Sequence, residues 1–440
     1  MMWLSDEILL TILELLYYSR GDFARYGKKR DLLACRATCR RLRDLGQSLA
    51  FTHISFMHDE EGYTKLLEIS KSVHLCHTIR YITCSFENLE ARLTPEQFAR
   101  FMGLNTVRTQ REPNDRYEEY HCRYQSRQYF ESNNVHIASL VAALPRFGNL
   151  HTVRILEDVR HISGNWESLD RVSTNSHAGL AVFEALVSTL FVMELGIERL
   201  VLGSSPGDSP PLIGILQGLN PAKQNLYQKA FGSLNYLKLV LPTVIYHEDG
   251  GFGQRHKLNY DGISALIWAA PLLNELQLVF DMPSQDALPS RFLKSLQIPR
   301  LRTLQLVTIA FQDPLCLARF FSKHATALKR VELSDLSLET GSWETVFTEM
   351  RDVLMLNSII LSGEFSIGGS LTGGITLGSI QIDEYAELEC EFGHRWVDIA
   401  GEACRVRDIK VIESFIQRKT DDIPFDALRL SMHMHNHPQD

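Results

Sequence analysis

The hexapeptide Leu273-Asn274-Glu275-Leu276-Gln277-Leu278 is the clearest indication of the fold of this chain, because its apolar pattern returns downstream at an almost constant interval. The same apolar-x-x-apolar-x-apolar phrase opens again at Leu301, Leu328 and Leu356, so the four copies start 28, 27 and 28 residues apart. A pattern that repeats at this interval predicts an array of similar structural units. Each unit then contacts its neighbours along the chain.

Four further copies of the phrase lie upstream at wider and less regular spacing. They begin at Ile79, Leu150, Ile197 and Leu234, which separates successive copies by 71, 47 and 37 residues and the last of them from Leu273 by 39. The irregular spacing indicates that some units carry insertions or that one unit has decayed. The number of repeats before residue 230 therefore stays open.

Each phrase is expected to be a β-strand, because residues at alternate positions of a strand point to the same face. Helical patterns precede the later copies, at residues 263–268, 317–321 and 346–350, and Ser342 is a suitable N-cap for the last of these helices. Strands joined through helices pair in parallel. The expected fold is therefore α/β, a curved solenoid of parallel strands and helices with an extended concave surface.

Side chains that flank the buried strand positions are the candidates for binding a target protein, since they point away from the core. These candidates are Arg154, Tyr236, Lys238, Glu275, Gln277, Thr303, Gln305, Arg330 and Glu332.

Polar segments interrupt the expected solenoid, which we place at residues 57–379. Residues 105–134 form the most conspicuous insertion, and insertions in repeat arrays are usually loops that carry binding specificity. Shorter polar segments occur at 160–177, 203–211 and 247–257. The Gly- and Ser-rich stretch 363–378 is expected to break the array. Beyond it we expect a C-terminal cap at 380–430, with a helix at 408–417, and a disordered tail at 431–440.

The amino terminus carries more apolar surface than a small helical unit can bury. Residues 4–16 (LSDEILLTILELL) predict a helix that is apolar on nearly all sides, capped by Ser5. A second helical run follows at residues 31–45, where Leu32, Cys35, Cys39 and Leu42 line one face, and a third element spans 51–56. We interpret Cys35 and Cys39 as packing residues. This apolar excess indicates a binding partner.

These N-terminal residues resemble an F-box, the helical module that joins a substrate receptor to the Skp-family adaptor of a cullin-RING ubiquitin ligase. The matching segments are Leu4-Ser5-Asp6-Glu7-Ile8, Asp31-Leu32-Leu33 and Thr38-Cys39-Arg40-Arg41-Leu42. Ser5 replaces the usual proline, Thr38 the usual valine, and the link at 17–30 is longer than usual. The resemblance implies an all-α F-box at residues 1–56, with adaptor contacts at Leu4, Ile8, Ile12, Leu15, Leu32, Leu33 and Leu42.

The repeats, in turn, resemble the leucine-rich repeats that follow many F-boxes, although the usual Asn or Cys after the strand is missing. Residues 331–335 through 341–343 resemble late repeats of fungal F-box proteins. Together the two resemblances imply a non-enzymatic substrate-recognition subunit of an SCF-type ubiquitin ligase, with the adaptor, a cullin held through it, and an unidentified target protein as partners. The arginines at 36, 40, 41 and 43 would then guide docking onto an acidic adaptor surface.

Two other functional classes remain open. The first is a leucine-rich-repeat scaffold whose N-terminal helices only cap the sheet, and the second is an enzyme of unknown type. The sequence contains no phosphate-binding loop ending in Gly-Lys-Ser/Thr and no His-Glu-x-x-His motif. Cys390, His394 and Cys404 lack the fourth ligand that a zinc site needs. We therefore expect no cofactor and no metal.

Composition narrows the classes of partner and the cellular compartments that we expect for the protein. The chain of 440 residues has a net charge of −8, which argues against general nucleic-acid binding. We found no apolar stretch of membrane-spanning length, and the eight cysteines are scattered without a CxxC pair. Scattered thiols in a long chain favour an intracellular protein, in the cytoplasm or the nucleus. The oligomeric state and any need for target phosphorylation stay open.

Overall fold

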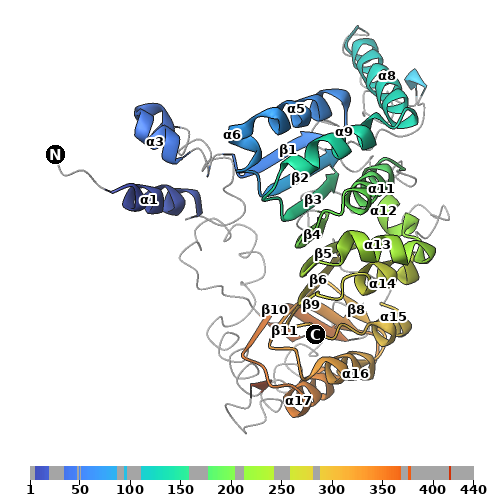
Figure 1. Cartoon of the computed structure of the whole chain (residues 1–440). Coiled ribbons are helices and arrows are strands. Elements are labelled where there is room, and N and C mark those ends of the chain that lie inside the picture. Colours follow the sequence, from blue (N-terminus) through green and yellow to red (C-terminus); the bar gives the residue numbers. More distant parts are fainter. Residues whose placement is uncertain are drawn as a thin grey trace, which may run out of the picture.

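The fold is taken from a computed structural model of the chain, shown in Figure 1. The structure describes residues 5–18, 34–46, 49, 51–86, 94–96, 111–157, 177–203, 213–241, 258–280, 288–367, 375–377 and 416–417.

One open sheet of eleven strands runs through the described residues, in the order β1-β2-β3-β4-β5-β6-β7-β9-β10-β11, with β8 paired to β9 beside this path. All pairings are parallel except that of β10 with β11. The strands are β1 His53–Met57, β2 Tyr81–Phe86, β3 Thr152–Glu157, β4 Arg199–Leu202, β5 Tyr236–Leu241, β6 Glu275–Phe280, β7 Thr303–Val307, β8 Ala310–Phe311, β9 Arg330–Leu338, β10 Ser358–Ile367 and β11 Ile375–Leu377.

The repeated phrase sets the register of this sheet. The second apolar residue of each of the eight phrases occupies one continuous row of paired positions, and these residues are Ile82, Val153, Leu200, Leu237, Leu276, Leu304, Val331 and Ile359. All eight are buried, as are the residues two positions further on. The prediction that every phrase is a parallel strand is therefore confirmed.

Helices line one side of the sheet, and in Figure 1 they follow the outer side of the arc that the strands make. They are α5 Glu60–Lys71, α6 Val73–Cys76, α8 Arg111–Ser132, α9 Val135–Ala143, α11 His177–Val192, α12 Ile213–Gly218, α13 Gln224–Phe231, α14 Tyr260–Trp268, α15 Ser290–Ser295, α16 Pro314–His324 and α17 Trp343–Val353. The three helices predicted before the later strands are confirmed. Ser342 caps α17, since its Oγ accepts from the Thr345 N–H at 3.2 Å.

A single apolar core lies between the helices and the sheet and extends from Ile54 in β1 to Phe365 in β10. Ile416 is helical and fully buried in the same core, so part of the chain beyond residue 380 packs against the repeats. The rest of the expected C-terminal cap, and the tail at 431–440, lie outside the described residues. The polar segments at 160–177, 203–211 and 247–257 also lie almost entirely outside them.

The N-terminal helices form a second, much smaller cluster. Helix α1 (Asp6–Tyr18) buries Leu13 together with Leu49, and the half-buried Leu10 and Leu42 pack against this pair. The expected cap is present, because the Ile8 N–H points to Ser5 Oγ at 3.4 Å. Half-buried Phe51 packs against both this cluster and the main core, and so joins the helical pair to the sheet.

The second helical run differs from its prediction at Cys39. Residues 34–38 are helical, but Cys39 is extended and exposed, and a new helix, α3 (Arg40–Leu45), begins after it. The Cys39 thiol instead accepts from the Leu42 N–H at 3.4 Å, as an N-cap does. Cys35 is half-buried against the small cluster and does pack as expected.

Three further expectations also need correction. Residues 53–57, expected to lie largely in the N-terminal helical unit, form β1, so the boundary expected after residue 56 falls inside the first strand of the sheet. Most of the insertion 105–134 is the 22-residue helix α8, not a loop, and Figure 1 shows it extending away from the sheet. The stretch expected to break the array at 363 continues as β10 to Ile367, with a register irregularity between Ser362 and Phe365.

Candidate interaction surfaces

Register brings the predicted target-binding residues together on the face of the sheet opposite the core. They occupy two rows. Tyr236, Glu275, Thr303 and Arg330 are paired in one row, and Arg154, Lys238, Gln277, Gln305 and Glu332 are in the other, where Val201 stands between Arg154 and Lys238. The candidate residues thus form one surface, on the inner side of the arc in Figure 1, which the helices do not cover. We call it the outer face of the sheet because its side chains point away from the core.

Polar contacts run across the strands of the outer face. Gln305 Nε2 donates to Glu332 Oε1 at 2.8 Å, between β7 and β9, and Arg330 lies 3.9 Å from Glu332. Gln277 Nε2 donates to Glu275 Oε1 at 3.4 Å within β6. Most of these side chains are half-buried, and together they present a largely polar surface.

Tyr236 is the one candidate that proves to be buried, with 7% of its surface exposed. The Arg199 guanidinium covers it, at 3.7 Å from the centre of the ring. Burial raises the pKa of the Tyr236 hydroxyl to about 12, although the charge of Arg199 opposes this shift, and the phenol therefore stays neutral near pH 7. Arg199 was not among the candidates. It nevertheless stands two residues after the start of its phrase at Ile197, just as the candidate Glu275 stands two residues after the start of the phrase at Leu273.

The predicted adaptor contacts are described only in part. Ile8 and Ile12 lie one turn apart on α1 and are 49% and 42% exposed, whereas Leu13 is 1% exposed. Leu42 is half-buried against the small cluster. Leu4, Leu32 and Leu33 lie outside the described residues, as does the side chain of Leu15. Arg41, from the basic cluster, forms an ion pair with Asp6 at 2.7 Å and so holds α3 against the start of α1.

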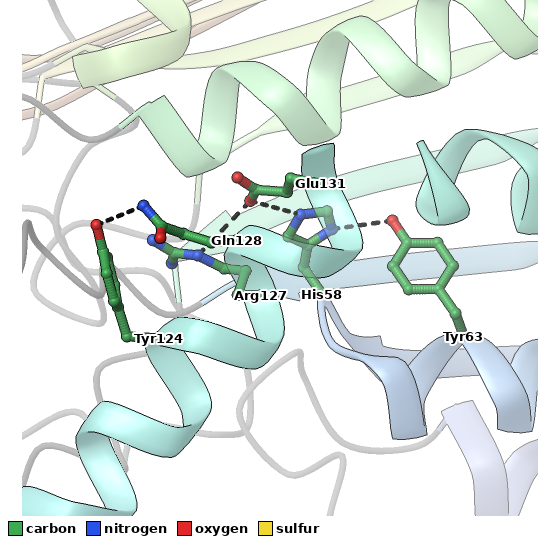
Figure 2. Close-up of polar contacts among 6 residues, drawn as sticks. All are labelled: His58, Tyr63, Tyr124, Arg127, Gln128 and Glu131. Atoms are coloured by element: carbon green, nitrogen blue, oxygen red, sulfur yellow. Dashed lines mark hydrogen bonds and ion pairs between the residues drawn. The ribbon is translucent and has the colours of Figure 1, made fainter. Parts of the chain in front are cut away.

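A buried polar cluster anchors α8 to the first strand, as Figure 2 shows. The fully buried His58 side chain, just after β1, lies 3.1 Å from Glu131 Oε1 through Nε2 and 3.0 Å from the Tyr63 hydroxyl through Nδ1. Arg127 lies 3.6 Å from the same carboxylate. Burial raises the pKa of Glu131, but His58 and Arg127 outweigh it and leave the pKa below its ordinary value.

The His58 cluster is best understood as a structural joint. Because α8 is held at Glu131, near its C-terminal end, the rest of the helix extends outward with stacked aromatic rings at Tyr117, Tyr120, His121 and Tyr124. Within the described ranges no group of three or more His, Cys, Asp or Glu side chains is placed to hold a metal ion. Nor does any described helix have the length and apolar character to cross a membrane.

Comparison with known proteins adds little to this geometry. No protein-family model and no curated protein matches the chain. Among solved structures, the chain is similar to the leucine-rich repeat-containing protein LegL7 from Legionella pneumophila, at 12% sequence identity and a TM-score of 0.27, over 84% of this chain and 99% of that one. That likeness is too distant to support a conclusion about this chain. The repeat architecture is inferred from the parallel pairing of the strands.

Proposed function

We propose that this protein is a protein-interaction receptor that docks onto a Skp-family adaptor through its N-terminal helices and holds a target protein on the outer face of its sheet. In that role it is the substrate-recognition subunit of an SCF-type ubiquitin ligase and contributes proximity and orientation to ubiquitin transfer. The observation that carries the proposal is the exposure of Ile8 and Ile12 on a helix that is otherwise held by its own small cluster.

Two exposed isoleucines one turn apart form the kind of strip that an amphipathic helix lays into the groove of a partner. Leu13, next to Ile12 in sequence, already holds α1 to its own chain. The two functions of the helix are therefore separable by residue. Leu13 maintains the fold of the helical pair, and Ile8 and Ile12 are left for an adaptor.

Co-purification with a purified Skp-family adaptor tests the docking. Ile8→Asp removes the apolar contact but places an acid in the first turn of α1, where the helix dipole tolerates it. We expect binding to weaken by about thirtyfold or more, as for an interface hot spot. Leu32→Asp tests the second helical run in the same way.

Met355→Asp is the matched control, since Met355 is 61% exposed and lies before β10, at the far end of the array. The same apolar-to-acid change there should leave adaptor binding intact. If the adaptor binds the Ile8→Asp and Leu32→Asp variants as tightly as the parent chain, the docking proposal is wrong.

The alternative is a scaffold whose N-terminal helices only cap the sheet. One observation favours it: Phe51 packs on both clusters, so the helices do contact the end of the array. This alternative predicts that the full chain does not bind the adaptor and that deletion of residues 1–50 lowers the melting temperature of the repeats. Under the docking proposal the deletion abolishes adaptor binding and leaves the melting of the repeats nearly unchanged.

A further inference from the structure

One stretch of the array carries far more positive charge than the rest of the chain. Residues 288–330, which the structure describes without a gap, contain eight lysines and arginines and a single acid, Asp313. Their net charge of +7 is opposite in sign to the net charge of −8 of the whole chain. The stretch covers α15, β7, β8, α16 and the start of β9, which belong to two adjacent repeats.

Six of the eight cations gather at one edge of the sheet, where the helices end and the parallel strands begin. Two are in the last turns of α15 and α16, and four lie just before or at the start of β7 and β9. We call this set the basic edge, and its members are Lys294, Arg300, Arg302, Lys323, Lys329 and Arg330. Two contacts join the repeats here, because the Lys329 N–H donates to the Arg302 carbonyl at 2.8 Å and Lys323 Nζ donates to the Lys294 carbonyl.

The helix dipole accounts for only part of this cluster. Lys294 and Lys323 lie in the last turns of their helices, where a lysine balances the partial negative charge of the free carbonyls. The four other cations precede or begin strands, and sheets have only small net dipoles. Among the described residues, the one carboxylate that forms an ion pair with the basic edge is Glu332, at 3.9 Å from Arg330. Five of the six side chains are exposed, so most of this charge faces solvent.

An apolar surface borders the basic edge on the preceding repeat. Trp268, at the end of α14, is 41% exposed, and Leu272, in the turn before β6, is 40% exposed. Because Glu275 of β6 pairs with Thr303 of β7, Leu272 has the position in its repeat that Arg300 has in the next one. A ligand that spans these two repeats would therefore meet apolar surface and positive charge side by side.

The size of the basic edge limits the anion that it can hold. Adjacent strands are about 5 Å apart and packed layers about 10 Å apart, so the six cations cover a surface on the order of 10 to 15 Å across. Acids lie on either side of it, with Glu275 and Glu332 on the outer face and Glu349 on α17. A nucleic acid strand or a charged bilayer would extend past the cations and meet these acids, whereas a short acidic peptide would not.

We infer that the basic edge binds a short acidic segment of a partner protein, with Trp268 and Leu272 contacting an apolar side chain next to the acids. The attraction speeds association and weakens as salt is added. This surface lies at the edge of the sheet and meets the outer face only at Arg330, so the inference goes beyond the proposed function and does not depend on it.

Peptide libraries test the inference on the full chain. One degenerate library carries a short fixed run of glutamates beside a fixed aromatic residue, and a second carries glutamines in place of the glutamates. A mixed-sequence single-stranded RNA is the third probe. We expect the glutamate library to be retained about tenfold or more above the glutamine library, with the difference shrinking as salt is raised. Equal retention of the two libraries overturns the inference, and so does tighter binding of the RNA than of the glutamate library at the same salt concentration.

Charge-reversing variants locate the site. Arg300→Glu and Arg302→Glu should each remove most of the preference for the glutamate library, because they add repulsion as well as remove attraction. Arg319→Glu is the matched control, since Arg319 is exposed on α16 within the same charged stretch but outside the basic edge. A loss with Arg319→Glu as large as with Arg302→Glu contradicts the placement, as does full retention by both edge variants.

Two further measurements complete the test. Arg300, Arg302 and Arg319 are exposed, so the three variants should melt at the temperature of the parent chain, and a loss of binding then reports on the surface and not on folding. Trp268→Gln should lower retention of the glutamate library by about threefold, since it removes the apolar contact and leaves the charge. Unchanged retention by Trp268→Gln contradicts that contact.

Discussion

The repeat array and the N-terminal helical pair differ in how completely they bury their apolar residues. In the array, the apolar positions of every phrase enter one core that extends from β1 to β10. In the helical pair, Leu13 is buried but Ile8 and Ile12, on the same helix, remain about half exposed. Among the described residues, the apolar side chains of the strands are therefore buried within the chain, whereas two apolar side chains of the first helix stay about half exposed.

This difference follows from geometry. A strand in a one-sided sheet needs only its alternate residues covered, and the helices of each repeat provide that cover. A helix that is apolar on nearly all sides needs neighbours around its whole circumference. The described residues give α1 a neighbour on one side, through Leu42 and Leu49, so a second neighbour is what the docking proposal supplies.

The largest expected effect is in the array. Leu237→Ala removes a fully buried side chain from the middle of the β5 ladder, with apolar neighbours on β4 and β6 in the same row. The free energy of unfolding should fall by about 4 kcal/mol, because both burial and packing are lost. Urea denaturation followed by circular dichroism measures this, with Lys238→Ala, one residue along, as the control. A near-neutral Leu237→Ala would show that the array is not one packed core.

Leu13→Ala should act strongly but locally. It removes the residue that holds α1 in the small cluster, and we expect a loss of about 2.5 kcal/mol confined to the helical pair. Hydrogen exchange should then speed up in residues 6–18 and 34–46 while the amides of β5–β7 keep their protection. Faster exchange throughout the sheet would mean that the two regions unfold as one unit.

Acid should weaken the array through His324. This buried side chain accepts from the Ile298 N–H at Nε2 (3.0 Å), so Nδ1, 2.8 Å from the Phe320 carbonyl, carries the proton. Burial lowers the pKa of His324 below its ordinary value. The neutral form is thus favoured in the folded state, and this contribution to stability is present above about pH 6.5 and declines as the pH falls below it.

Thermal melts between pH 8 and pH 5 check this expectation. The melting temperature of the parent chain should fall across that interval, and the fall should be smaller in His324→Leu, which has no proton to bind. A parent and variant with identical pH profiles would contradict the assigned role of the histidine.

Ile12→Ser should have the smallest effect on stability and sharpens the contrast with its neighbour Leu13. Ile12 is 42% exposed, so the change should alter the free energy of unfolding by less than about 0.5 kcal/mol. Urea denaturation of Ile12→Ser and Leu13→Ala side by side measures the difference. A large destabilisation by Ile12→Ser would place Ile12 in the fold and not in an interface.

The array could be predicted from the sequence because its signal is local and repeated. Each phrase carries its own period of two, so the strands, their parallel pairing and the buried rows follow from the spacing of leucines. The helix caps are equally local, and Ser5 and Ser342 both cap as predicted. The outer-face residues followed directly, since they are the positions between the buried ones.

The predictions that failed concern features whose structure is set by tertiary contacts. Helix α8 has a polar sequence without an apolar stripe. It is held by Phe130, which is buried in the main core, and by Glu131, which contacts His58 from 73 residues away in sequence. Strand β1 lacks the full phrase and is defined by pairing with β2. Arg199 was overlooked for a different reason. The phrase at Ile197 places it on the outer face, but its stacking on the Tyr236 ring is a tertiary contact that the spacing of residues does not reveal.

Hydrogen exchange of α1 with and without a purified Skp-family adaptor is the most direct test of the central claim, that the first helix keeps an apolar strip for a partner. We expect amides in residues 6–18 of the free chain to exchange faster than those of β5–β7, and we expect saturating adaptor to slow them while exchange in the sheet is unchanged. Exchange in residues 6–18 that is already as slow as in the sheet, or that does not respond to the adaptor, contradicts it.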